Sequence, residues 1–234
     1  MTPDAARKPP PGAARKPPPG MVPDRPARPA RPPLAGLRLV RLHLASRRVP
    51  AALAAITGCA AVLRVTLHWH WDTYGGLQLP LVLEAGAASV IAVTTASPIG
   101  DPERATSRWL PFLRLGAALA LTAFAVGALD AAGIGAQQAG GTLDVLRNVS
   151  GMTGIGLCCA AVLGGELAWA GPLAYLVVGT YALYEAWHGM AQTTPWIWPA
   201  RPPGDLGAAI CAGLVYAAGI AAITVYGARD PGVG

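Results

Sequence analysis

The stretch RRVPAALAAITGCAAVLRV, residues 47–65, contains the boundary that decides the fold. Before Pro50 the chain is rich in proline, and eleven Lys or Arg residues against Asp4 and Asp24 give this part a net charge of +9. After Pro50, seven basic residues against ten acidic ones give −3, and the sequence is mostly apolar. A basic segment directly before a first apolar span is a strong determinant of membrane orientation. The sequence therefore predicts an integral membrane protein with a cytoplasmic N-terminus.

The overall composition argues against a soluble domain. Charged residues make up 13% of the chain and hydrophobic residues 53%, whereas a soluble domain carries about 25% charged residues. The net charge of +6 comes from the segment before Pro50, so it does not form a basic face on a folded domain. We expect this segment to meet anionic lipid head groups and not nucleic acid.

The segment before Pro50 divides into two parts. Residues 1–33 contain a tandem AARKPPPG repeat, at 5–12 and 13–20, and their proline content predicts a disordered basic tail. Residues 34–49 lack proline and place apolar and basic side chains on different faces of a helix. This pattern predicts an amphipathic helix in the membrane interface, although a simple extension of the first span remains the alternative.

Residues 50–229 are predicted to form an all-α domain of six transmembrane helices. A spanning helix needs about 20 largely apolar residues, and six stretches meet this condition: 50–67, 77–97, 111–135, 146–164, 167–186 and 206–227. Arg104 and Arg108 lie in the second connection, as expected for a cytoplasmic loop. With an even number of spans, both termini are predicted to be cytoplasmic, in a multi-pass protein of the cell membrane.

Small residues recur every four positions in three of the predicted spans. Such stripes let helices approach closely in lipid, which favours a compact bundle or a homodimer. The stripes are Ala123, Gly127 and Ala131 in the third span, Gly156, Ala160 and Gly164 in the fourth, and Ala209, Gly213, Ala217 and Ala221 in the sixth.

Four ionisable residues lie within or at the ends of the predicted spans: Arg64, Glu84, Asp130 and Glu185. Charges in a bilayer are costly and usually face the bundle interior or water. The depths of Arg64 and Glu84 in adjacent spans are similar, which predicts a pair between them. Such a pair would be either a salt bridge that fixes packing or part of an outward-facing polar vestibule with Asp130 and Glu185 at its rim.

Other motifs give no catalytic, cofactor or metal site. His68 and His70 would point to different sides of a helix, so they are interpreted as interfacial residues and not as metal ligands. Ser150 and His188 lack the sequence context of an intramembrane serine protease, and GMTGIG (151–156) has no lysine for a phosphate loop. The sequence therefore predicts no enzyme. The cysteines lie in spans without CxxC spacing and are interpreted as packing residues: Cys59, Cys158, Cys159 and Cys211.

The layout resembles the membrane subunits of ABC transporters of the second exporter type. The resemblance rests on the amphipathic stretch 34–48, the charged connection 98–109 and the aromatic, proline-broken segment WHGMAQTTPWIWPARPPGD (187–205) between the last two spans. RNVSGMTG (147–154) and GGELAW (164–169) also resemble permeases of high-GC actinobacteria.

This resemblance implies a permease-like half-channel that dimerises and works with a separate ATP-binding subunit to export a substrate. ATP would bind that partner, which would be contacted by Asp101, Glu103, Arg104 and Arg108. Two alternatives remain open at this point. One is a membrane scaffold without a transport role, and the other is a proton-coupled secondary transporter that uses Glu84 or Asp130.

Overall fold

The structure is a computed structural model that describes residues 48–69, 73–95, 110–135, 141–187 and 194–227. Two short 3-10 helices, η1 (Gly165–Leu167) and η2 (Trp198–Ala200), accompany the long helices. The long helices are α2 (Val49–Thr66), α3 (Thr73–Thr95), α5 (Leu110–Gly133), α6 (Gly141–Leu163), α7 (Ala170–Trp187) and α8 (Leu206–Val225).

All six long helices have the length and apolar composition of a membrane span. The prediction of an all-α, multi-pass membrane protein with six spans is therefore confirmed for the described part of the chain. The tail predicted for residues 1–33 lies outside the described residues, as do residues 34–47 of the predicted interfacial helix.

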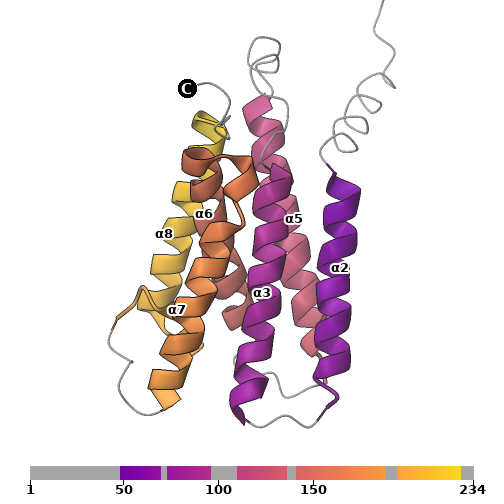
Figure 1. Ribbon diagram of the computed structural model, residues 1–234, viewed down its shortest axis with the longest axis vertical. Coiled ribbons are helices and arrows are strands. Elements are labelled where there is room, and N and C mark those ends of the chain that lie inside the picture. The colour runs from indigo at the N-terminus through magenta and orange to yellow at the C-terminus, as the bar shows by residue number, and fades with distance from the viewer. Residues whose placement is uncertain (1–47, 70–72, 96–109, 136–140, 188–193, 228–234) are drawn as a thin grey trace, which may run out of the picture.

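Successive helices run in opposite directions and form one bundle around α3 and α6 (Figure 1). Half of the spanning residues of α3 and 61% of those of α6 are buried, against 17% in α2 and 22% in α8. The helix α2 packs on α3 and α5, α7 packs on α3 and α6, and α8 packs mainly on α6. Residues that belong to α3 and α6 are therefore the ones shielded best from the surroundings.

Three helix boundaries show how local sequence sets the fold. Pro50 lies in the first turn of α2, where a missing backbone N–H leaves no hydrogen bond unmade. The fourth span begins at Gly141, five residues before the predicted 146, and Asp144 in its first turn interacts favourably with the helix dipole. Gly164 has φ of 99° between α6 and η1, which permits the tight hairpin expected between the fourth and fifth spans.

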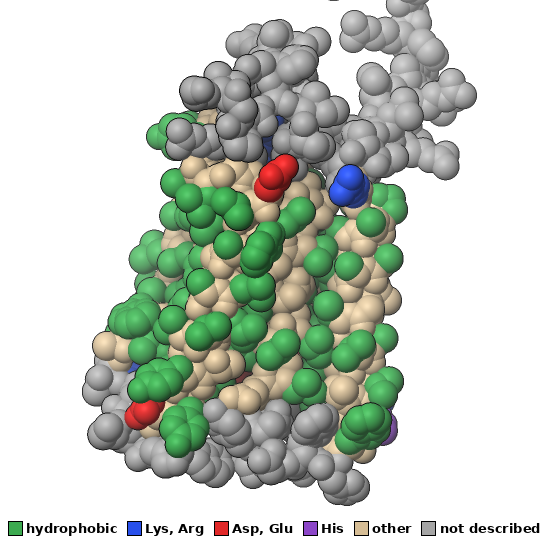
Figure 2. All heavy atoms as spheres, viewed as in Figure 1, with side chains coloured by type: hydrophobic (Ala, Val, Ile, Leu, Met, Phe, Trp, Pro, Cys, Tyr) green, Lys and Arg blue, Asp and Glu red, His purple; other side chains and the backbone are tan. Residues whose placement is uncertain are grey.

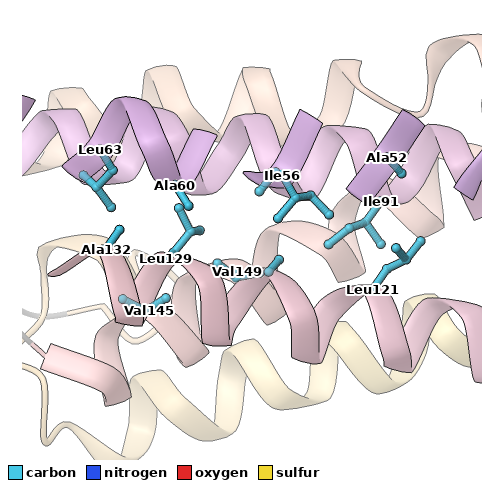
Figure 3. Close-up of a cluster of buried hydrophobic side chains, with 12 residues drawn as sticks. Ala52, Ile56, Ala60, Leu63, Ile91, Leu121, Leu129, Ala132, Val145 and Val149 are labelled. Carbon is cyan, nitrogen blue, oxygen red and sulfur yellow. The ribbon is translucent and has the colours of Figure 1, made fainter. Parts of the chain in front are cut away.

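Apolar side chains of four helices form one continuous cluster in the bundle. Ile56 and Leu63 of α2 meet Ile91 of α3, Leu129 of α5 and Val149 of α6, and all five are fully buried (Figure 3). The buried side chains of α2 recur about once per helical turn, at Ala52, Ile56, Ala60 and Leu63, which places them on one face. This packing holds the most exposed helix, α2, against the centre of the bundle.

The outward faces of the helices are also apolar. Hydrophobic side chains cover the visible face between its two ends, whereas the visible charged side chains lie near the ends (Figure 2). Large hydrophobic residues such as Phe112, Val177 and Leu214 are each about two-thirds exposed. A surface of this kind suits the hydrocarbon core of a bilayer.

The small-residue stripes differ in burial. In α6, Gly156 and Ala160 are buried, as expected for close helix packing. In α8, Ala208 and Ala212 are buried, and the helix does not pack through the predicted stripe. The stripe residues of α5 and α8 are exposed: Ala123, Gly127, Ala131, Ala209, Gly213, Ala217 and Ala221.

Candidate functional site

Polar side chains gather between the middle of the bundle and the end that carries the connection from α7 to α8. They come from the middle of α3, from the first two turns of α6 and from the segment that leads into α8. We call this group the polar cluster: Glu84, Asp144, Arg147, Asn148, Arg201 and Asp205.

Glu84 and Asn148 form the innermost pair of the polar cluster. Asn148 Nδ2 donates to Glu84 Oε2 over 3.0 Å, and the two residues are 7% and 2% exposed. No cation lies within ion-pair distance of Glu84 among the described residues. An ionised carboxylate without such a cation is costly in a bilayer. A neutral carboxyl group would also supply a donor for Asn148 Oδ1, which is buried without a partner in the described structure.

Arg147 connects α6 to the segment before α8. Its guanidinium forms an ion pair with Asp144, one turn earlier in α6. The same group donates to the carbonyl oxygen of Pro202 over 2.9 Å and to that of Arg201 over 3.2 Å. Arg147 is only 4% exposed, so a buried charge is compensated by one carboxylate and two carbonyl groups.

Asp205 begins α8 and completes the cluster. Asp205 Oδ1 accepts from the backbone N–H of Ala208 over 2.9 Å, so the side chain caps the helix. Asp205 Oδ2 accepts from Arg201 Nε over 2.7 Å. The hydrogen bond from the Ala208 N–H, followed by that from Arg201, holds the pKa of Asp205 below its usual value.

Trp198 anchors the connection from α7 to α8 in the bundle. Its ring lies 4.4 Å from that of Tyr175, centroid to centroid, and is 2% exposed. Tyr175 also donates its hydroxyl to the carbonyl oxygen of Trp196 over 2.8 Å. Gly151 makes room for the indole, because a Cβ at this position would lie 2.6 Å from Trp198. Trp198, in the described part of this aromatic segment (194–205), is thus packed against residues of α6, α7 and α8.

The pair predicted between Arg64 and Glu84 is wrong. Arg64 donates to the carbonyl oxygens of Ala132 and Ile134, at the end of α5, and the Ala132 contact measures 3.4 Å. The last carbonyl groups of a helix have no partner within it, so they satisfy the arginine without a carboxylate. Glu84 is bonded to Asn148 of α6.

The outward-facing vestibule with Asp130 and Glu185 at its rim stays a prediction. Asp130 lies in α5 and Glu185 near the end of α7, and both are half-buried. No hydrogen bond or ion pair joins any two of Arg64, Glu84, Asp130 and Glu185 in the described structure. Only Glu84 belongs to the polar cluster.

Several other residues singled out in the sequence lie outside the described residues. They are His70, His188 and the candidate coupling residues Asp101, Glu103, Arg104 and Arg108. Among the described residues, the ring of His68 shares a hydrogen bond of 2.8 Å with the carbonyl oxygen of Arg64. Ser150 donates back to its own helix. In this part of the chain no three His, Cys, Asp or Glu side chains are grouped as a metal site would require.

Five members of the polar cluster were not predicted as site residues: Asp144, Arg147, Asn148, Arg201 and Asp205. The sequence carried one signal for them. Asp144 precedes Arg147 by three residues, a spacing that places opposite charges on one helix face. Arg201 precedes Asp205 by four residues across Pro202, Pro203 and Gly204, so their pairing depends on a turn and not on a helix face. A helix start placed at residue 146 excluded Asp144 from the span.

The polar cluster supplies hydrogen-bonding and charged groups in an otherwise apolar bundle, as binding and proton sites in membrane proteins do. It includes neither a cysteine nor a histidine. Its carboxylate, guanidinium and amide groups can donate and accept hydrogen bonds and pair opposite charges. In comparisons with known proteins, no family model, curated protein or solved structure matches this chain.

Proposed function

We propose that the protein is a permease-like subunit that dimerises and works with a separate ATP-binding subunit to export a substrate. In this proposal the protein lies in the cell membrane with both termini in the cytoplasm. The segment 98–109 couples it to the ATP-binding subunit. The proposal starts from the resemblance to ABC transporters of the second exporter type.

The observation that supports it best is the fold of the connection between α7 and α8. Exporters of this type have an outer segment here whose short helices return toward the bilayer. In this chain the segment contains the helix η2, and Trp198 is buried against Tyr175. Arg147 donates hydrogen bonds to the carbonyl oxygens of Arg201 and Pro202 in the same segment. A connection fixed in this way follows the movement of α6, α7 and α8 when the bundle changes shape.

The proposal is tested by placing a photoreactive amino acid at position 104 in the full-length chain in its native membranes. Irradiation should join the chain to a protein that binds a photoreactive ATP analogue, because segment 98–109 would contact that subunit. Position 166 provides the control. Glu166 is exposed in η1, at the end of the bundle to which α3 and α6 lead, but it lies outside the coupling segment.

Capture from the two positions and co-purification of the deletion variant decide the test. Capture of an ATP-binding protein from position 104 but not from position 166 supports the proposal. Deletion of 98–109 should then abolish its co-purification while the protein still inserts in the membrane. Equal capture from both positions, capture of proteins without ATP-binding activity, or normal co-purification of the deletion variant would each contradict it.

Glu84 favours a second candidate, a proton-coupled secondary transporter. Its carboxyl group is buried in the middle of α3 and has no cation partner among the described residues. Asp130, the other acid considered for this role, forms no hydrogen bond with it. Proton movement across vesicles that contain the protein, driven by a pH difference, would be lost in Glu84→Gln and kept in Asp130→Asn. A subunit driven by ATP would show no proton movement that depends on Glu84.

A further inference from the structure

A groove of about 780 Å³ opens between α5, α6 and α8, and we call it the α5–α8 groove. At one end of the bundle α5 lies against the residues that follow α8. A Cβ at Gly227, just after α8, would lie 2.6 Å from Nη1 of Arg114 in α5. Toward the polar cluster, α5 and α8 leave a hollow between residues 119–127 of α5 and 206–216 of α8. The groove therefore lies within two membrane spans.

Small side chains on both walls leave the groove open. Ala123 and Gly127 line it from α5, and Ala209 and Gly213 line it from α8. A Cβ added at Gly127 or Gly213 would meet no atom within 4 Å. These are the stripe residues that do not pack within the bundle, so their small size leaves space beside the protein.

One end of the groove is polar. Arg147, Ser150 and Asp205 line it beside Gly204. Arg147 is 4% exposed, and its Nε has no hydrogen-bond partner among the described residues. Arg147 is paired with Asp144 and Asp205 with Arg201, so this end contains both signs of charge in equal number.

We propose that the α5–α8 groove binds one amphiphilic lipid. Its hydrocarbon chain lies between Gly127 and Gly213, and its head group lies at Arg147 and Asp205. Because the groove presents a donor and a carboxylate at the same end, it suits a zwitterionic head group with a phosphate and an ammonium group. The site needs no ATP-binding partner, so its test is independent of the proposed function.

The polar end and the volume of the groove favour a lipid over a helix from a second copy of the protein. The groove measures about 780 Å³. Pockets for small molecules have volumes of about 300–1,000 Å³. A second helix would also bring apolar side chains against Arg147 and Asp205 at the polar end.

The experiment uses the full chain in nanodiscs that contain phosphatidylethanolamine with a photoreactive group on one acyl chain. Irradiation should give adducts concentrated on residues 119–127 and 206–216. Gly127→Leu and Gly213→Leu fill the groove, and each should reduce these adducts about tenfold, as expected when about two methylene groups lose their contacts. Gly58→Leu is the matched control, since Gly58 in α2 also has open space around it but does not line the groove.

Adducts spread evenly over the outward faces of all six spans would overturn the proposal, as would unchanged labelling in both leucine variants. The adduct map of the wild type needs no variant, so it decides the question even if a variant fails to fold. A change from dimer to monomer in Gly127→Leu, with unchanged labelling, would assign the groove to a second copy. Stronger labelling by an anionic phosphatidylglycerol probe than by the zwitterionic probe would overturn the assignment of the head group.

Discussion

Gly154 of α6 and Gly219 of α8 bring the backbones of the two helices into direct contact. A Cβ at Gly219 would lie 2.4 Å from the Gly154 carbonyl oxygen, and a Cβ at Gly154 would lie 2.5 Å from the Cα of Tyr216. Real Cβ atoms do not come this close to backbone, so only glycine fits at either position. The pair accounts for the extensive packing between α6 and α8.

Substitution of these glycines should separate the helices. We expect Gly154→Ala and Gly219→Ala each to lower the free energy of unfolding by about 1–3 kcal/mol, the usual cost of overpacking. Thermal unfolding of the purified protein in detergent measures this change. Gly213→Ala is the control, because its Cβ would meet nothing within 4 Å. Equal losses of stability in all three variants would show that helix contact is not the cause.

Trp198 should be required for the folded connection between α7 and α8. Trp198→Ala removes a buried ring that stacks on Tyr175, and the loss should be about 3–5 kcal/mol. Limited proteolysis of the purified protein should then cut between residues 188 and 205. Trp196→Ala keeps the carbonyl group that Tyr175 binds and removes a side chain that is 53% exposed. Rapid cutting in the Trp196 variant alone would contradict the assigned roles.

Glu84 should be replaceable by glutamine but not by alanine. Glutamine keeps an oxygen that can accept from Asn148 and carries no charge, so Glu84→Gln should be at least as stable as the wild type. Glu84→Ala leaves the Asn148 amide buried without its acceptor, which costs about 1–3 kcal/mol. Unfolding of both variants in detergent measures the difference. A loss in Glu84→Gln as large as that in Glu84→Ala would show that the fold needs an ionised carboxylate.

Asp205 should make stability depend on pH in the acidic range. Its folded pKa lies below the unfolded value, which is near 3.9. The carboxylate therefore contributes stability that is complete above the unfolded pKa and is lost as pH falls through the folded pKa. Asp205→Asn keeps an acceptor for Ala208 but loses the ion pair with Arg201, so its unfolding should change less across this range. Identical pH profiles for the wild type and the variant would contradict this contribution.

The six spans could be predicted from the sequence because each depends on the length and composition of an apolar run. The partners of individual side chains could not, because they depend on the rotation of each helix. Residues in a helix are turned by about 100° from one to the next, so an error of one position changes the face. The α8 stripe illustrates this, since Ala208 and Ala212 are buried while Ala209 and Gly213 are exposed.

The candidate site was harder to predict, for a related reason. Arg147 and Asn148 lie at the start of an apolar run, beside polar residues, where hydropathy alone places the boundary of the span. Their burial becomes clear only when α3 and the connection before α8 are in place. Glu84 was identified from the sequence because it lies well inside its apolar run, but its partner was not.

The contact between Arg147 and the carbonyl oxygen of Arg201 joins residues that are 54 positions apart. During synthesis, α6 leaves the ribosome before residues 201 and 202 are made. The guanidinium of Arg147 therefore reaches the membrane before the two carbonyl groups that accept from it. The last span thus has a docking place that precedes it, which would guide its insertion. A chain truncated before Arg201 would lack both carbonyl partners of Arg147 and leave Asp144 as the partner of its guanidinium. Such a partly satisfied cation beside lipid is a signal by which membrane quality control could recognise an unfinished molecule.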